Sequence, residues 1–116
     1  MVLIARALAS GARSLILDEP ASALDFKNQQ KVISVLARLA KRGITVLFTS
    51  HNPQHVLSCA HKALLMYAPD RVQWGQTDEV MSKENLEGLY GITVRRFEFE
   101  ERGHIMRALV PVIYPE

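Results

Sequence analysis

The sequence predicts an α/β fold with a parallel strand–helix–strand core, and three successive segments carry that prediction. Residues 14–17 show no alternation of polar and apolar positions, which is typical of a strand buried on both faces. Residues 26–42 repeat apolar side chains every three or four positions, as an amphipathic helix does. Residues 44–49 are rich in β-branched and aromatic residues and predict a second buried strand. Such a unit is right-handed, with its two strands parallel.

Composition limits the classes of protein that the chain can belong to. At 116 residues and 48% hydrophobic content, it can form one small domain with its own core. The net charge of +2 is too weak to indicate nucleic acid as a partner. The single cysteine, Cys59, excludes an internal disulfide and a cysteine-based metal site. No apolar stretch approaches the roughly 20 residues that cross a bilayer, and no signal peptide is recognisable, so we expect a cytosolic protein.

The helices beside the core have clear local signals. Residues 2–10 are apolar almost all round, so we expect a buried helix there. Asp25 is a good N-cap for the helix at 26–42, and Gly43 suits the position just beyond its end. Asn52 can cap a further helix whose first residue is Pro53 and which continues to about Ala60.

The remainder of the chain predicts short strands, two short helices and an antiparallel hairpin. Strands at 63–67 and 72–74 flank a turn, and Thr77 and Ser82 can cap helices at 78–81 and 83–90. Residues 92–101 and 105–110 form the hairpin. Its alternation predicts one packed face that carries Phe97 and Phe99.

Two adjacent acids mark the candidate site. Asp18 and Glu19 follow the first strand directly, and Pro20 prevents the strand from continuing. The carboxyl ends of parallel strands share one edge, where ligands bind in α/β sheets, and His51 follows the second strand at that edge. Neighbouring carboxylates suit a metal-nucleotide site, in which one holds the ion and the other handles water. The plainer interpretation is a strand that ends in an acidic turn beside a structural histidine.

The block Ser14-Leu15-Ile16-Leu17-Asp18-Glu19-Pro20-Ala21-Ser22-Ala23-Leu24-Asp25 resembles the Walker B motif and D-loop of ABC-transporter ATPases. This resemblance implies a P-loop NTPase (RecA-like) domain that uses ATP and Mg²⁺. It implies that Asp18 holds Mg²⁺, usually through water, and that Glu19 orients or deprotonates the attacking water. Members of the family commonly have Thr at the position of Ala21.

Two further segments extend the resemblance. Phe48-Thr49-Ser50-His51 is similar to the H-loop, which implies that His51 contacts the γ-phosphate as the switch histidine. The stretch from Ser22 to Asp25 is similar to the D-loop. This similarity implies that Ser22 and Asp25 contact the nucleotide and the dimer partner. Residues 83–92 resemble the tail of importer subunits for iron-siderophore, haem, cobalamin or molybdate systems.

The resemblance also implies an organisation and a set of partners. Residues 1–62 correspond to the part of the ATPase core with the Walker B motif, D-loop and H-loop, and residues 63–116 to a carboxyl-terminal extension of the same domain. The implied partners are a second ATPase subunit, an integral-membrane permease and, indirectly, a substrate-binding protein, without nucleic acid. The implied location is cytoplasmic, peripheral on the inner face of the plasma membrane.

The printed sequence contains no Gly-x-x-x-x-Gly-Lys-[Ser/Thr] loop and no Gly-rich signature loop. We therefore expect the chain to correspond to the C-terminal half of an ABC ATPase. By itself it should be inactive, and either poorly soluble or associated with another chain. One alternative is a soluble ABC-type ATPase of DNA repair or translation, against which the segment after Ala63 argues. Another is a non-catalytic dimerisation or binding module with vestigial carboxylates. His55, His61 and His104 are interpreted as ordinary helix or surface residues.

Overall fold

A computed structural model describes residues 2–115 of the chain, with side chains from residue 4 onward. The chain divides into two compact units, Met1–His51 and Asn52–Glu116, which are described separately below. The division predicted at 62/63 follows sequence motifs rather than compactness, and it stays a prediction.

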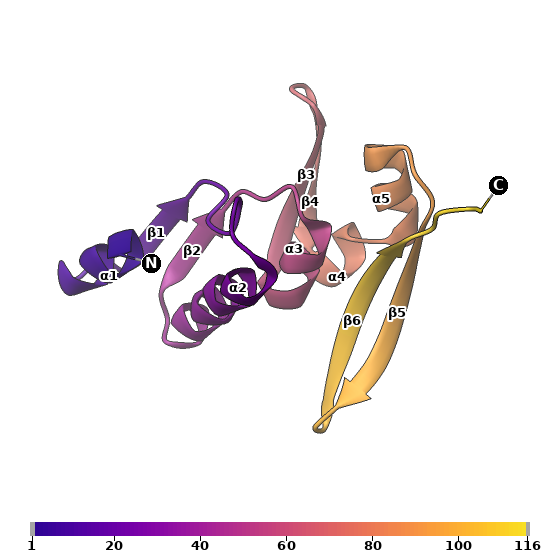
Figure 1. The fold of residues 1–116 in the computed structure, drawn as a ribbon. Helices are drawn as coiled ribbons and strands as arrows, with labels where there is room; N and C mark the ends of the chain where they lie inside the picture. The colour runs from indigo at the N-terminus through magenta and orange to yellow at the C-terminus, as the bar shows by residue number, and fades with distance from the viewer. Residues whose placement is uncertain (1, 116) are drawn as a thin grey trace. The chain divides into compact units, whose positions relative to one another are not determined.

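The first unit contains the predicted parallel core. Its elements are α1 (Val2–Ala9), β1 (Ser14–Leu17), α2 (Phe26–Lys41) and β2 (Thr45–Phe48), shown from indigo to purple in Figure 1. Strands β1 and β2 are parallel, and their register runs from Ser14 opposite Thr45 to Leu17 opposite Phe48. The α/β fold class and the strand–helix–strand order are confirmed.

Helix α2 supplies most of the apolar surface that this unit buries. The Asp25 carboxylate caps its first turn, because Oδ1 accepts a hydrogen bond from the Asn28 N–H across 2.8 Å. Gly43, at φ 88°, adopts the left-handed conformation just after the helix. Burying one large apolar side chain stabilises a fold by about 1.5–3 kcal/mol. The buried side chains of α2 are Val32, Ile33, Leu36 and Leu39.

The prediction that both strands are buried on both faces is wrong. Leu15 is only 6% exposed, but Ile16 is 81% exposed and its register partner Leu47 is 60% exposed. One face of the pair is covered, and the face with Ile16 and Leu47 is open within the described part of the chain. An apolar run in the sequence indicates that both faces of a strand should be buried, but it does not show which segment buries them.

The prediction of a buried first helix is correct only for one side of α1. Ile4 is 7% exposed, whereas Ala5 and Arg6 are exposed to solvent. The side chains of Val2 and Leu3 lie outside the described residues. The apolar character all round α1 is therefore not matched by burial all round.

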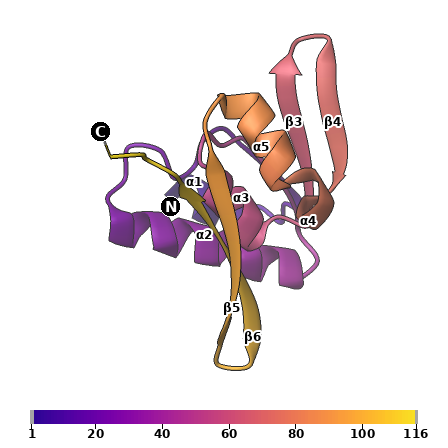
Figure 2. The same cartoon turned by 90° about the vertical axis from the view of Figure 1, so that its right-hand side faces the viewer.

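The second unit is built from two antiparallel ribbons and three short helices (Figure 2). Its core joins the helices to the inner faces of the ribbons and consists of Leu57, Ala63, Leu65, Val80, Met81, Leu86 and Val94. In chain order the elements are α3 (Pro53–Cys59), β3 (Lys62–Ala68), β4 (Arg71–Gln76), α4 (Thr77–Val80), α5 (Lys83–Tyr90), β5 (Val94–Glu101) and β6 (His104–Pro111).

The predicted caps in this unit have different outcomes. Asn52 caps α3 by accepting from the Gln54 N–H, and Ser82 caps α5 by accepting from the Asn85 N–H. The prediction that Thr77 caps α4 is wrong, because Thr77 is the first residue inside that helix. Its side chain is only 3% exposed, and its hydroxyl has no hydrogen-bond partner among the described residues. Thr77 therefore contributes to packing and not to a cap.

The hairpin β5–β6 packs through the face opposite to the predicted one. Phe97 and Phe99 are 44% and 49% exposed, while Val94 is buried. Arg96, on the face of Val94, donates to the carbonyl oxygens of Asp78 and Met81 at 2.9 and 3.2 Å and also binds the Asp78 carboxylate. The Arg96 guanidinium thereby satisfies carbonyl groups at the end of α4. These bonds hold the face of the hairpin that carries Val94 and Arg96 against α4.

No helix among residues 2–115 combines the length and the apolar character that crossing a membrane requires.

Candidate functional site

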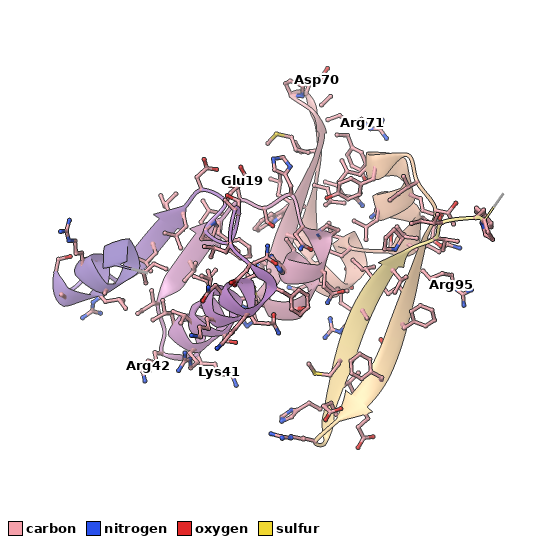
Figure 3. All side chains as sticks on the ribbon, viewed as in Figure 1. Glu19, Lys41, Arg42, Asp70, Arg71 and Arg95 are labelled. Atoms are coloured by element: carbon pink, nitrogen blue, oxygen red, sulfur yellow. The ribbon has the colours of Figure 1, made fainter. Side chains whose placement is uncertain are left out.

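The parallel register brings the residues that follow β1 and β2 to one edge of the first unit. Asp18 and Glu19 follow β1, and Thr49 follows β2. The Thr49 N–H donates to the carbonyl of Leu17 across 3.0 Å, so the ladder continues one residue beyond the strands. In Figure 3, Glu19 lies on the loop that leaves β1. The edge predicted for the site is the one on which these residues meet.

Thr49 connects the two acids. Its Oγ1 donates to Oδ1 of Asp18 across 2.5 Å and accepts a hydrogen bond from the backbone N–H of Glu19 across 3.0 Å. Thr49 is not among the predicted site residues. A signal was present, since a hydroxyl residue directly after the second strand faces the residue directly after the first.

Glu19 and His51 form the second contact of the site. Oε1 of Glu19 lies 3.3 Å from Nε2 of His51, and the His51 side chain is 90% exposed. Glu19 has a φ of 43°, in the left-handed region that glutamate rarely adopts and that costs roughly 1–2 kcal/mol. Its carbonyl accepts a hydrogen bond from the Ser22 N–H across 3.1 Å. The sharp turn after β1 thus directs the Glu19 carboxylate toward His51.

The five predicted site residues fall into two groups. Thr49 joins Asp18 to Glu19, and the 3.3 Å contact joins Glu19 to His51. The Asp25 carboxylate caps α2, and the Ser22 side chain is exposed in the loop between β1 and α2. Both loop residues are accessible to a partner or a nucleotide from outside the chain.

The donor set at this edge fits Mg²⁺ as one ligand among several. Among residues 2–115 no three His, Cys, Asp or Glu side chains cluster closely enough to hold a metal ion. Mg²⁺ prefers oxygen ligands and usually binds one or two carboxylates together with water and substrate phosphates. Asp18 offers a carboxylate of this kind at the end of a strand. The site therefore suits a metal that arrives with a phosphate group, and it does not suit a metal held by protein alone.

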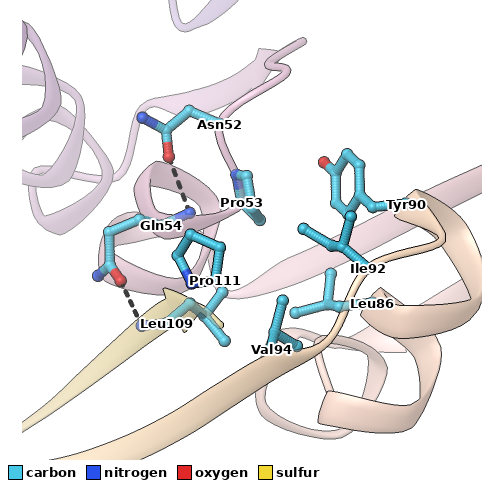
Figure 4. A pocket seen from close by; sticks show the side chains of 9 residues that line it. All are labelled: Asn52, Pro53, Gln54, Leu86, Tyr90, Ile92, Val94, Leu109 and Pro111. Atoms are coloured by element: carbon cyan, nitrogen blue, oxygen red, sulfur yellow. Dashed lines mark hydrogen bonds between the residues drawn. The ribbon is translucent and has the colours of Figure 1, made fainter. Parts of the chain in front are cut away.

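The second unit contains an apolar pocket of about 280 Å³ (Figure 4). Apolar side chains such as Leu86, Val94 and Leu109 line it. The amide of Gln54, at its rim, is occupied by the backbone of β6, because Oε1 accepts from the Leu109 N–H across 2.7 Å. The residues that line this pocket include no acidic or basic side chain, so the pocket resembles an apolar binding surface more than a catalytic centre.

Comparison with known proteins defines the class: the homologues of the chain are ATP-binding subunits of ABC transporters. The molybdate import ATP-binding protein MolC of Haemophilus influenzae is 36% identical over 113 residues, which cover 97% of this chain and 44% of that protein. The vitamin B12 import ATP-binding protein BtuD of Citrobacter koseri is 37% identical over 92 residues, covering 79% of this chain and 36% of BtuD.

A solved structure and a family profile add to this result. The structure described as "An inward-facing conformation of a putative metal-chelate type ABC transporter" superposes with a TM-score of 0.85 at 34% identity, over 97% of this chain and 45% of that one. The profile described as "AAA domain, putative AbiEii toxin, Type IV TA system" matches residues 1–57. The chain thus spans less than half the length of these relatives.

Proposed function

We propose that this chain is the part of an ATP-hydrolysing, energy-coupling subunit of an ABC importer that carries the Walker B motif, the D-loop and the H-loop. The observation that carries the proposal is the cluster of Asp18, Glu19 and His51 around Thr49 at the ends of two parallel strands. The cargo we propose is a metal chelate or related oxyanion of the iron-siderophore, haem, cobalamin or molybdate type. The names of the relatives support this class of cargo.

In the proposed reaction each residue has a separate task. Asp18 holds Mg²⁺, which supplies charge neutralisation on the phosphates of ATP. Glu19 orients the attacking water and accepts its proton, as its partly exposed carboxylate allows. His51 binds the γ-phosphate from the same edge. Its 3.3 Å contact with Glu19 places the two side chains next to each other.

The proposed assembly follows from the same resemblance. Ser22 and Asp25 face a second ATPase subunit across a dimer interface, and the dimer drives an integral-membrane permease that receives cargo from a substrate-binding protein. This subunit is peripheral on the cytoplasmic face of the membrane. Nucleic acid has no part in the proposed function.

A chimeric transporter subunit tests the proposal. The segment of Haemophilus influenzae MolC that matches this chain is replaced by residues 1–116, and ATP hydrolysis is measured. We expect hydrolysis in the chimera and a loss of at least about a hundredfold with Glu19→Gln, because general-base assistance is typically worth 10²–10⁴ in rate. Nucleotide binding is expected to persist.

The control for this test is Glu79→Gln, which removes an exposed carboxylate on α4 of the second unit. Its hydrolysis should equal that of the unmodified chimera. A chimera that binds ATP and hydrolyses it equally well with Glu19→Gln would remove Glu19 from the proposed role.

A further inference from the structure

The charges of the chain are divided unevenly between its two units. Residues 1–51 carry seven basic and three acidic side chains, whereas residues 52–116 carry seven basic and nine acidic ones. The three acids of the first unit lie in the segment from Asp18 to Asp25, before α2 begins. The remainder of that unit therefore contains bases but no acid, although the net charge of the whole chain is only +2.

Helix α2 gathers most of these bases on one face. Successive residues of an α-helix are about 100° apart around the axis, so positions 27, 31, 38 and 41 fall within an arc of about 80°. The C-cap Arg42 continues this arc, and the buried side chains of α2 lie on the opposite side. In Figure 3, the side chains of Lys41 and Arg42 project outward from the end of α2. The basic face of α2 is defined here as Lys27, Lys31, Arg38, Lys41 and Arg42.

The five cations of the basic face have no acidic partner within residues 4–115. All five side chains are exposed to solvent. The ion pairs of the described residues involve His51, Arg96 and Arg107 instead. Position 34, in the middle of the face, is an exposed serine and not an acid. The positive charge of the face is therefore not neutralised by neighbouring side chains.

This arrangement is unfavourable for α2 by itself. Lys27 and Lys31 are four residues apart, as are Arg38 and Arg42, and like charges at this spacing repel each other. Lys27 also lies in the first turn, where the helix dipole favours acidic residues and α2 has none. Mixed charges would stabilise the helix better, so an anionic partner explains the basic face better than the stability of α2 does.

The shape of the basic face favours a flat partner. At 1.5 Å per residue, its cations extend along about 22 Å of one convex side of the helix. A bilayer surface is flat and its lipids move laterally, so anionic headgroups can approach all five cations together. The face has no aromatic side chain on which the bases of a nucleic acid could stack. Charge and shape together therefore favour an anionic membrane surface.

We propose that the basic face of α2 docks on the anionic phospholipid headgroups of a bilayer. The attachment is electrostatic and reversible, because the face consists of cations and a serine and presents no apolar side chain for insertion among the lipids. The proposal rests on the proposed function for the location of the subunit at a membrane. It adds that the subunit contacts the lipid itself, through α2, and not only a permease.

Binding of the 116-residue chain to vesicles tests the proposal. The chain is mixed, without nucleotide, with vesicles of phosphatidylcholine alone or of equal parts of phosphatidylcholine and phosphatidylglycerol, and bound protein is measured by cosedimentation. We expect binding to the mixed vesicles only. Binding should disappear as NaCl rises from about 0.1 M to about 1 M, because salt screens the attraction between exposed charges.

Two triple variants with the same change in net charge locate the contact. Lys31→Gln, Arg38→Gln and Lys41→Gln together should weaken binding about a hundredfold, since each basic residue near an anionic surface contributes roughly fivefold. They also remove repulsion within α2, so this variant should resist urea at least as well as the parent chain. The control substitutes glutamine for three exposed cations of the second unit, Lys62, Lys83 and Arg102. It should bind as the parent does.

Three results would overturn the proposal. Equal weakening in both triple variants would show that net charge, and not the basic face, attracts the lipid. Equal binding to vesicles of phosphatidylcholine alone would show that adhesion does not depend on anionic headgroups. Tighter binding to a short duplex DNA than to the mixed vesicles would identify nucleic acid as the partner.

The MolC chimera extends the test to a whole subunit. It should bind the mixed vesicles, and the three substitutions on α2 should weaken that binding. Absence of vesicle binding by the chimera would mean that the rest of the subunit covers α2, and the proposal would be wrong. Vesicle binding needs no ATP, so it can succeed while Glu19→Gln shows the proposed hydrolysis to be wrong, and the reverse can also occur.

Discussion

The Thr49 hydroxyl donates a hydrogen bond to Oδ1 of Asp18 across 2.5 Å and so joins the end of β2 to the end of β1. The same oxygen accepts the N–H of Glu19 at 3.0 Å, at a residue whose φ of 43° is unfavourable for glutamate. One neutral side chain therefore positions the first carboxylate and stabilises the turn that directs the second. The two acids are held by the fold before any nucleotide binds.

Replacing Thr49 by valine tests this role. Thr49→Val keeps the β-branched shape but removes both hydrogen bonds, so we expect the free energy of unfolding to fall by about 1–2 kcal/mol, as measured by urea denaturation. Thr45→Val is the control, since Thr45 is an exposed residue of β2 at its other end. Equal stability of Thr49→Val and the parent chain would show that the hydroxyl does not support the turn.

Ala23, in the loop that resembles a D-loop, provides a backbone test. Its φ of 62° lies in the left-handed region, and its side chain is exposed, so packing does not confound a substitution. Ala23→Val should lower the free energy of unfolding by roughly 1–2 kcal/mol because a β-branched side chain worsens the strain. Ala23→Gly should be neutral or stabilising by up to about 1 kcal/mol, since glycine adopts this conformation freely.

The control for the loop is Ala5→Val, an exposed position on α1, where helix propensity alone predicts a cost below about 1 kcal/mol. Urea denaturation of the four proteins gives the comparison. If Ala23→Gly were the more destabilising of the two loop variants, the left-handed conformation of this loop would be incorrect.

The side-chain amide of Gln54 forms two hydrogen bonds with the backbone of β6, as a neighbouring strand would. Its Nε2 donates to the carbonyl of Arg107 at 3.0 Å, and its Oε1 accepts from the Leu109 N–H at 2.7 Å (Figure 4 shows the latter). Gln54→Ala leaves a part-buried N–H without its partner, so we expect a loss of about 1–3 kcal/mol in unfolding free energy. Hydrogen exchange at the Leu109 amide should accelerate as well.

Gln30→Ala is the matched control for Gln54, because Gln30 is exposed on α2. It should change neither stability nor exchange at Leu109 by a measurable amount. Unchanged protection of that amide in Gln54→Ala would mean that the glutamine does not hold β6 to α3.

Local patterns in the sequence account for the core of the first unit. The period of residues 26–42, the cap at Asp25 and the turn at Gly43 are all properties of neighbouring residues, and each is found in the structure. The meeting of Asp18 with the region of His51 also followed, because parallel strands share an edge. What sequence position alone could not show was the link through Thr49, which depends on the register of residues 31 positions apart.

The incorrect predictions about which strand faces are buried have a common physical origin. Ile16, Phe97 and Phe99 are apolar residues in strands, and the sequence shows which face they share but not whether anything covers it. In the hairpin the choice of face was decided by Arg96, whose guanidinium reaches the carbonyls of α4. Periodicity measures only the spacing of apolar residues along the sequence, so it does not reveal such contacts between distant segments.

Cys59 predicts a pH dependence of both reactivity and stability. Burial raises the pKa of the Cys59 thiol from 9.0 to about 11. Since the thiolate is the reactive form, alkylation by iodoacetamide at pH 8 should be about a hundredfold slower in the native chain than in urea. The chain has one cysteine, so mass spectrometry of the adduct reports on this site alone.

Stability follows the same shift in pKa. Below pH 9 both folded and unfolded chains keep the proton, but between pH 9 and about 11 only the unfolded chain loses it, so stability falls as the pH rises through this range. Burial also raises the pKa of Tyr90, and Cys59→Ser separates the two contributions by removing only that of the thiol. Fast alkylation of the native chain at pH 8 would contradict the buried environment.

A polypeptide of these 116 residues should not bind Mg-ATP measurably by itself. Asp18 can contribute one ligand to a metal ion and His51 one contact to a phosphate, but a nucleotide is gripped chiefly by the backbone amides and lysine of a phosphate-binding loop, which this sequence lacks. Isothermal titration calorimetry of the purified chain should show no saturable heat. The MolC chimera, measured in the same buffer, is the positive control. Micromolar affinity in the isolated chain that persists in Asp18→Asn would mean that nucleotide binds elsewhere than at the ends of β1 and β2.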